Sequence, residues 1–74
     1  MPMALAEPLW LSFNLLRFRS LVNRRVFSLV YADGEFELVQ LDGNDPQAGV
    51  VRSLYVGTDC EKVKMIIWKE VCNV

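Results

Sequence analysis

The stretch Val26-Phe-Ser-Leu-Val-Tyr-Ala-Asp-Gly-Glu-Phe-Glu-Leu-Val-Gln-Leu41 decides the fold class of this chain. Its first part, Val26–Tyr31, is rich in β-branched and aromatic residues, and Glu35–Leu41 alternates polar with apolar side chains. Both patterns are typical of strands. Asp33-Gly34 between them suits a type I′ turn, which needs positive φ at both central residues. The stretch therefore predicts a β-hairpin that turns at Asp33-Gly34.

Two later segments also carry strand patterns. Val50–Val56 is mostly apolar, follows the turn-rich residues 42–49 and precedes the turn-forming Gly57-Thr58-Asp59. Lys62–Lys69 begins with alternating lysine and apolar residues and continues as the apolar run Met65–Trp68, a pattern typical of an inner strand. We therefore expect strands at Val50–Val56 and at Lys62–Lys69, with Met65–Trp68 inside the fold.

Residues 9–23 fit two patterns. Apolar residues alternate along part of Leu9–Arg17, which favours a strand there, followed by an exposed loop over residues 20–25. A second set of apolar residues follows helical spacing: Leu11, Leu15, Phe18 and Val22. Pro8 also suits a first helical turn, but other apolar residues fall on the opposite side of such a helix. The alternation favours the strand, and a helix over Pro8–Val22 is the alternative.

Five antiparallel strands joined by short turns predict an all-β fold, a small sandwich-like single domain spanning residues 1–74. We expect residues 1–8 to be disordered. A full immunoglobulin-type sandwich needs about seven strands and around 100 residues. Part of one sheet is therefore expected to lie uncovered, or the chain is a fragment of a larger sandwich. An apolar content of 53% agrees with an uncovered sheet.

Charge and length exclude several functional classes. The net charge is −1 and the isoelectric point is near 5.2, which argues against nucleic acid as a partner. No apolar run is long enough to span a bilayer, and the first residues lack the pattern of a signal peptide. Cys60 and Cys72 flank the strand expected at Lys62–Lys69, whose ends would lie roughly 20 Å apart, so two free thiols are expected.

The residue supply argues against catalysis, metal binding and cofactor binding. The chain has no histidine, which excludes Ser-His-Asp triads and histidine-dependent metal sites and leaves Cys60 without a basic partner of that kind. Asp42-x-Asn44 begins like a calcium loop. However, Pro46 and Gln47 stand where such a loop needs its third ligand and its glycine. Glu35 and Glu37 lie on one face of the expected strand Glu35–Leu41. Such alternating glutamates are typical of the solvent-exposed face of an amphipathic strand and do not indicate a catalytic pair. We therefore expect a protein that is not an enzyme.

Two short motifs resemble a known family. Leu29-Val-Tyr31-Ala-Asp33-Gly34-x-x-x-Leu38-Val39 is followed by Val56-x-x-x-x-x-x-Val63-Lys64-Met65-Ile66-Ile67-Trp68. Together, over residues 26–69, they resemble a β-sandwich accessory module of Gram-positive, chiefly clostridial, cell-surface and secreted proteins. That family commonly places aspartate and serine after the tryptophan, whereas Lys69-Glu70 follows Trp68 here. The resemblance implies a non-catalytic module with fibronectin-like architecture, at the cell surface or outside the cell.

The sequence thus predicts a structural or interaction module that acts through protein contact. Its candidate interaction residues are Trp10, Phe13, Phe18, Leu54 and Tyr55, whereas Phe27, Phe36 and Trp68 are expected in the core. Open strand edges predict a homo-oligomer, or another protein partner, with Leu9–Phe18 or Val50–Val56 in the interface. The alternative function is a small membrane-surface protein, in which Pro8–Val22 forms a basic amphipathic helix.

Overall fold

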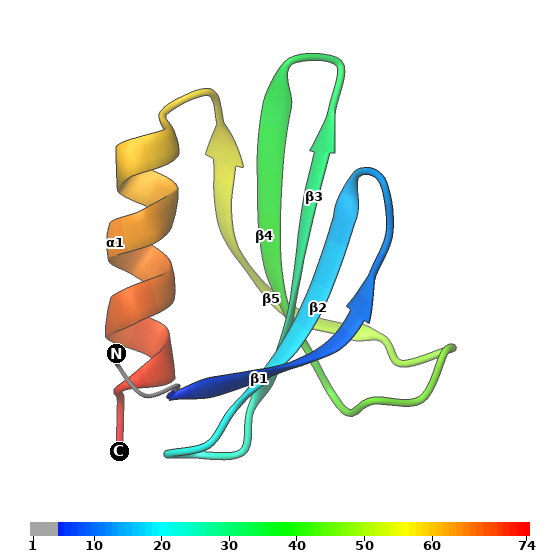
Figure 1. The fold of residues 1–74 in the computed structure, drawn as a ribbon, viewed down its shortest axis with the longest axis vertical. Coiled ribbons are helices and arrows are strands. Elements are labelled where there is room, and N and C mark those ends of the chain that lie inside the picture. The colour runs from blue at the N-terminus through cyan, green and yellow to red at the C-terminus, as the bar shows by residue number, and fades with distance from the viewer. Residues whose placement is uncertain (1–4) are drawn as a thin grey trace.

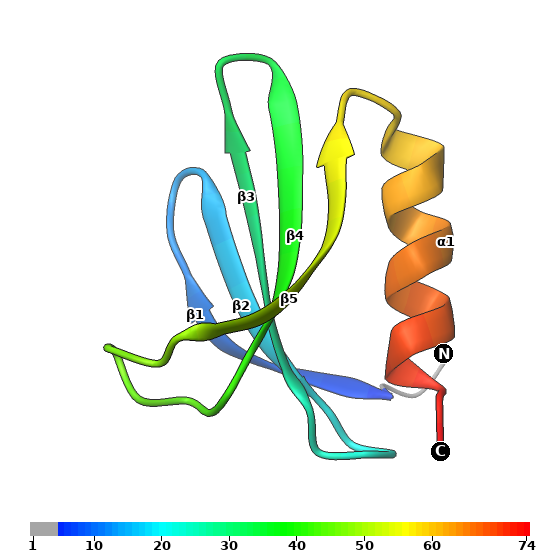
Figure 2. The same cartoon turned by 180° about the vertical axis from the view of Figure 1, so that it is seen from behind.

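A computed structural model describes residues 5–74 as one antiparallel sheet with one helix packed against it (Figure 1). The elements are β1 (Ala6–Leu11), β2 (Leu15–Ser20), β3 (Val26–Ala32), β4 (Glu35–Leu41), β5 (Val50–Gly57) and α1 (Cys60–Val71). The strands lie in the order β1-β2-β3-β4-β5, so each pairs with its neighbour in the chain. The view from behind shows a strongly twisted sheet, with the C-terminal end of α1 near the start of β1 (Figure 2).

The predicted hairpin of β3 and β4 is confirmed. Its register runs from Val26 opposite Leu41 to Ala32 opposite Glu35, which leaves a two-residue turn. Asp33 and Gly34 have φ values of 53° and 79°, as a type I′ turn requires. This turn fixes the register, so β3 and β4 form the centre on which the other strands assemble.

The prediction of a strand over Lys62–Lys69 is wrong, because this segment lies within helix α1. Asp59 caps the helix: its side chain accepts hydrogen bonds from the backbone N–H groups of Glu61 and Lys62. The side chains that are buried or half-buried follow helical spacing: Val63, Ile66, Ile67, Glu70 and Val71. Met65 and Trp68, expected inside the fold, are therefore on the outer side of α1, 70% and 65% exposed.

Neither prediction for the N-terminal segment is correct. The structure has neither a single strand over Leu9–Arg17 nor a helix over Pro8–Val22, but two strands, β1 and β2, joined by a turn at residues 12–14. The backbone N–H of Ser12 donates to the carbonyl of Leu15 across this turn, at 2.9 Å. Polar residues at positions 12 and 14 thus end one strand and start another. Of the segment 1–8 expected to be disordered, residues 1–4 lie outside the described residues, and Ala6–Pro8 belong to β1.

The fold is therefore mostly β, as predicted, but its second layer is a helix. All strands of residues 5–74 belong to one sheet, and no second sheet of a sandwich is formed within that part of the chain. The buried core cluster lies between the sheet and α1 and consists of Phe18, Phe27, Leu38 and Val71. The rings of Phe18 and Phe27 stack across β2 and β3 with centroids 5.5 Å apart. Phe27 is thus a core residue, as predicted.

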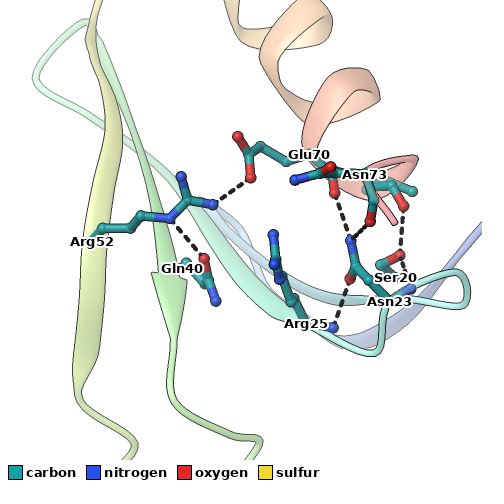
Figure 3. Close-up of polar contacts among 8 residues, drawn as sticks. Ser20, Asn23, Arg25, Gln40, Arg52, Glu70 and Asn73 are labelled. Carbon is teal, nitrogen blue, oxygen red and sulfur yellow. Dashed lines mark hydrogen bonds and ion pairs between the residues drawn. The ribbon is translucent and has the colours of Figure 1, made fainter.

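The turn between β2 and β3 holds the C-terminal end of α1 (Figure 3). Ser20 is fully buried, and its hydroxyl donates to the carbonyl of Val71 at 2.6 Å. The Asn23 side chain donates to the carbonyls of Glu70 and Asn73 at 2.8 and 2.6 Å. Carbonyls at the end of a helix lack N–H partners further along it, so the Ser20 hydroxyl and the Asn23 amide supply donors there. The carbonyl of Glu70 also accepts from the backbone N–H of Asn73, just past the helix, at 3.3 Å.

The ends of β5 and α1 are tied by two further contacts. The hydroxyl of Tyr55 accepts a hydrogen bond from the backbone N–H of Asp59, while the Tyr55 ring lies over Gly57, where a Cβ would come within 2.5 Å of that hydroxyl. Arg52 of β5 pairs with Glu70 of α1 and also donates to the side chain of Gln40 (Figure 3). The position of α1 is therefore fixed at both of its ends.

Candidate interaction surface

The face of the sheet that points away from α1 is covered in part by the loop of residues 42–49. The side chain of Asp42 accepts from the backbone N–H of Gly49, and that of Asp45 accepts from the N–H of Gln47. The carbonyl of Asp45 accepts a hydrogen bond from Nη1 of Arg17, in β2, at 3.1 Å. The loop thus reaches across the sheet and is attached to β2.

A pocket of about 470 Å³ lies between this loop and the β1–β2 hairpin. Its lining residues are Leu9, Trp10, Leu15, Arg17, Asn44 and Pro46. The register of β1 shifts between Pro8 and Trp10, so Leu9 is an extra residue in a bulge. A bulge re-aims side chains locally, and here the consecutive residues Leu9 and Trp10 both line the pocket.

The tip of the β1–β2 hairpin is apolar and exposed. Leu11 is 73% exposed and Phe13 is fully exposed, and both border a shallow groove of about 180 Å³. Tyr31 and Phe36 lie in the same groove, with ring centroids 4.8 Å apart. Tyr31 is 49% exposed, whereas Phe36, expected in the core, is half-buried. The exposed apolar side chains of the hairpin itself are Trp10, Leu11 and Phe13.

The structure places the five predicted interaction residues in three environments. Trp10, at 62% exposure, and Phe13 are both on the hairpin and open to solvent. Phe18 is only 5% exposed, so its prediction as an interaction residue is wrong: it faces α1 and belongs to the core. Leu54 and Tyr55 are half-buried and pack against that core, so they support α1.

Several residues of the surface were missed by sequence reasoning. Arg17 belongs to no motif of the sequence, and Asn44 and Pro46 lie in the turn-rich residues 42–49. They meet in one pocket only because β2 and the loop come together through the sheet. Met65 and Trp68 were missed because their segment was assigned to a strand. The helical spacing that begins at Val63, after the capping residue Asp59, was the signal that could have exposed them.

Both edge strands carry features that oppose further strand pairing. Pro8 lacks a backbone N–H and lies beside the bulge in β1. In β5 the register shifts twice, which makes Leu54 and Val51 extra residues opposite β4. Bulges twist an edge and interrupt its hydrogen bonding. The backbone edges of β1 and β5 are therefore poorly suited to strand addition, whereas the exposed apolar side chains are available for packing.

The remaining chemistry of residues 5–74 is sparse. That part of the chain holds no group of three or more Cys, Asp or Glu residues that could bind a metal ion. Cys60 is exposed and Cys72 is half-buried, at opposite ends of α1, and both are free thiols. Within the same residues, no helix has the length and apolar character needed to cross a bilayer.

Comparison of the chain with protein-family models, curated proteins and solved structures gave no match.

Proposed function

We propose that this protein is a non-catalytic interaction module that acts through protein contact at the tip of its β1–β2 hairpin. One observation supports the proposal: Trp10, Leu11 and Phe13 are all more than half exposed within four residues of one hairpin. Exposed aromatic side chains provide large contact areas and are enriched in protein interfaces. An apolar tip of this kind lowers solubility unless a partner covers it.

The partner proposed is a second copy of the chain. Two hairpin tips related by a two-fold axis present the same apolar patch to each other, which is the commonest arrangement of soluble homo-oligomers. Pro8 and the adjacent bulge at Leu9 in β1, together with the two bulges in β5, disfavour association by strand addition. The proposed contact is therefore made by the side chains of Leu11 and Phe13.

A role of this chain as an accessory module of a surface or secreted protein is a second proposal, which rests only on the resemblance of two short motifs. Its first motif lies in the β3–β4 hairpin, but Val63–Trp68 of its second motif lies in α1. A complete sandwich would need a second sheet in addition to residues 5–74. The membrane-surface alternative depended on a helix over Pro8–Val22, where the structure has β1, β2 and a turn.

Light scattering tests the dimer directly. The mass of one chain is 8.5 kDa, so a dimer at micromolar concentration gives about 17 kDa. The double variant Leu11→Ser/Phe13→Ser should return to the monomer mass, because it removes two exposed apolar contacts without touching the core. Circular dichroism should show that its fold is unchanged.

The matched control is Val50→Ser/Val51→Ser, which removes two exposed apolar side chains from the opposite edge of the sheet. This variant should remain dimeric. The proposal is overturned if the parent protein stays at 8.5 kDa as its concentration rises, or if the two double variants dissociate the dimer equally.

A further inference from the structure

The pocket between the β1–β2 hairpin and the loop of residues 42–49 has features of a ligand site that the proposed dimer contact does not use. Its volume of about 470 Å³ falls in the range of pockets that hold small organic molecules. Leu9, Trp10, Leu15 and Pro46 provide apolar walls, whereas Arg17 and Asn44 provide the polar groups. A few polar groups in an apolar pocket are typical of sites that orient an amphiphilic ligand.

Arg17 is the charged group of this pocket, and its charge is not balanced by a carboxylate. Among residues 5–74, Arg19 pairs with Glu7 and Arg52 pairs with Glu70, but Arg17 forms no ion pair. Its Nη1 atom donates to the neutral carbonyl of Asp45, while its Nε atom is buried and has no hydrogen-bond partner. A buried donor on a charged group without an acceptor is costly. Because Nε itself is inaccessible, an anion in the pocket would pair with the outer guanidinium nitrogens and balance the charge of the group.

The loop's own carboxylates are engaged elsewhere. The side chains of Asp42 and Asp45 accept hydrogen bonds from backbone N–H groups of the loop, those of Gly49 and Gln47. The planar guanidinium group matches a carboxylate, which can accept two parallel hydrogen bonds from it. Charge complementarity therefore selects an anionic head group at Arg17.

We propose that this pocket binds a small amphiphilic carboxylate. Its carboxylate pairs with the guanidinium of Arg17, and its alkyl or aromatic body packs between Trp10 and Pro46. The bulge at Leu9 is the feature of the fold that widens the apolar wall, because it brings two consecutive side chains of β1 to the same pocket. The pocket includes Trp10 of the exposed hairpin but neither Leu11 nor Phe13, the side chains proposed to make the dimer contact.

Tryptophan fluorescence provides the test. The chain has two tryptophans, so a Trp68→Phe variant leaves Trp10, in the pocket, as the only reporter. Decanoate is titrated below the concentration at which it self-associates, with 1-decanol and decyltrimethylammonium as neutral and cationic probes of the same chain length. Decanoate should change the Trp10 emission saturably and should bind at least tenfold more tightly than either control probe.

Arg17→Met in the Trp68→Phe background should weaken decanoate binding at least tenfold and leave the weak binding of decanol unchanged. Arg19→Met is the matched control: Arg19 lies two residues further along β2, on the same face, but is paired with Glu7. It should leave the affinity for decanoate unchanged. If Arg17→Met disturbs the fold by circular dichroism, Arg17→Lys keeps the charge but loses the planar group, and should weaken binding several-fold.

The proposal is overturned if decanoate does not bind saturably, if decanol binds as tightly as decanoate, or if the Arg17 and Arg19 variants behave alike. The Leu11→Ser/Phe13→Ser variant separates this inference from the dimer. It should lose the dimer and keep decanoate binding, so each proposal can fail without the other.

Discussion

The two faces of the sheet are covered by very different means. On one face, α1 places Val71 against Phe18, Phe27 and Leu38, and side-chain hydrogen bonds hold its end. On the other face, the cover is a polar loop, held by its own backbone and by one hydrogen bond from Arg17. The amphipathic helix completes the core cluster, whereas a loop of turn residues adds little apolar area, although Val26 and Leu41 of the sheet are also buried on its face. The face under α1 thus provides stability, and the face under the loop keeps a pocket.

The largest expected effect is on the α1 face. Phe27 is 1% exposed, and Phe27→Ala should lower the free energy of unfolding by about 3–5 kcal/mol, because it leaves a cavity in the only buried core cluster of residues 5–74. Urea denaturation measures the loss. Phe13→Ala, at the exposed hairpin tip, should change it by less than about 0.5 kcal/mol under conditions where the protein is monomeric.

A small domain has a low free energy of unfolding, so Phe27→Ala could prevent folding altogether. A milder variant keeps the prediction testable in that case. Phe27→Leu keeps most of the volume and should cost less than about 1.5 kcal/mol. Equal losses for Phe27→Ala and Phe13→Ala would show that the core does not lie under α1.

An intermediate effect compares two buried serines on opposite faces. Ser20 donates to the carbonyl of Val71 and accepts from the N–H groups of Val22 and Asn23, so Ser20→Ala should cost about 1–3 kcal/mol. The Ser28 side chain, on the other face, makes no hydrogen bond within residues 5–74, and Ser28→Ala should cost less than about 0.5 kcal/mol. Thermal unfolding should give a clear decrease in Tm for the first variant only.

Reversed effects of the two serine variants would contradict the hydrogen-bonded anchoring of α1. A second readout is hydrogen exchange, in which Ser20→Ala should speed exchange of the amides in the last turn of α1 and leave those of β3 unchanged.

The smallest expected effect is in the loop. Asp42 accepts one exposed hydrogen bond, from the N–H of Gly49, and Asp42→Ala should cost only about 0.5 kcal/mol. Asp59 is also exposed, but it caps α1 with two hydrogen bonds, so Asp59→Ala should cost about 1 kcal/mol. Urea denaturation of both variants measures the difference. A loop variant that costs as much as the cap variant would show that the loop is part of the stabilising core.

Local sequence patterns predicted the centre of the fold well. The β3–β4 hairpin and β5 were predicted within one or two residues of their bounds, because alternation, β-branched residues and Asp33-Gly34 act over short distances. The number of strands was also five, but they were not the same five: β1 and β2 were predicted as one strand, and α1 was counted as a strand.

The error at α1 has a definite physical cause. Met65–Trp68 is a run of four apolar residues, and such a short run does not distinguish a buried strand from one side of a helix. The choice depends on the neighbours: Asp59 at the start and the turn with Ser20 and Asn23 at the end both supply partners for helical backbone groups. Ser20 and Asn23 are about 50 residues away in the chain from the end of α1 that they contact, beyond the range of any local pattern.

The candidate pocket shows the same division. The sequence by itself determined which side chains are apolar or charged, where the central hairpin turns, and that histidine chemistry is absent. Tertiary structure alone decided that Arg17 and the loop residue Asp45, 28 positions apart, meet across the sheet, and that Phe18 is buried while Trp10 is not. The physical reason is that turns and alternation are local, whereas burial and pairing depend on which distant segment covers each face.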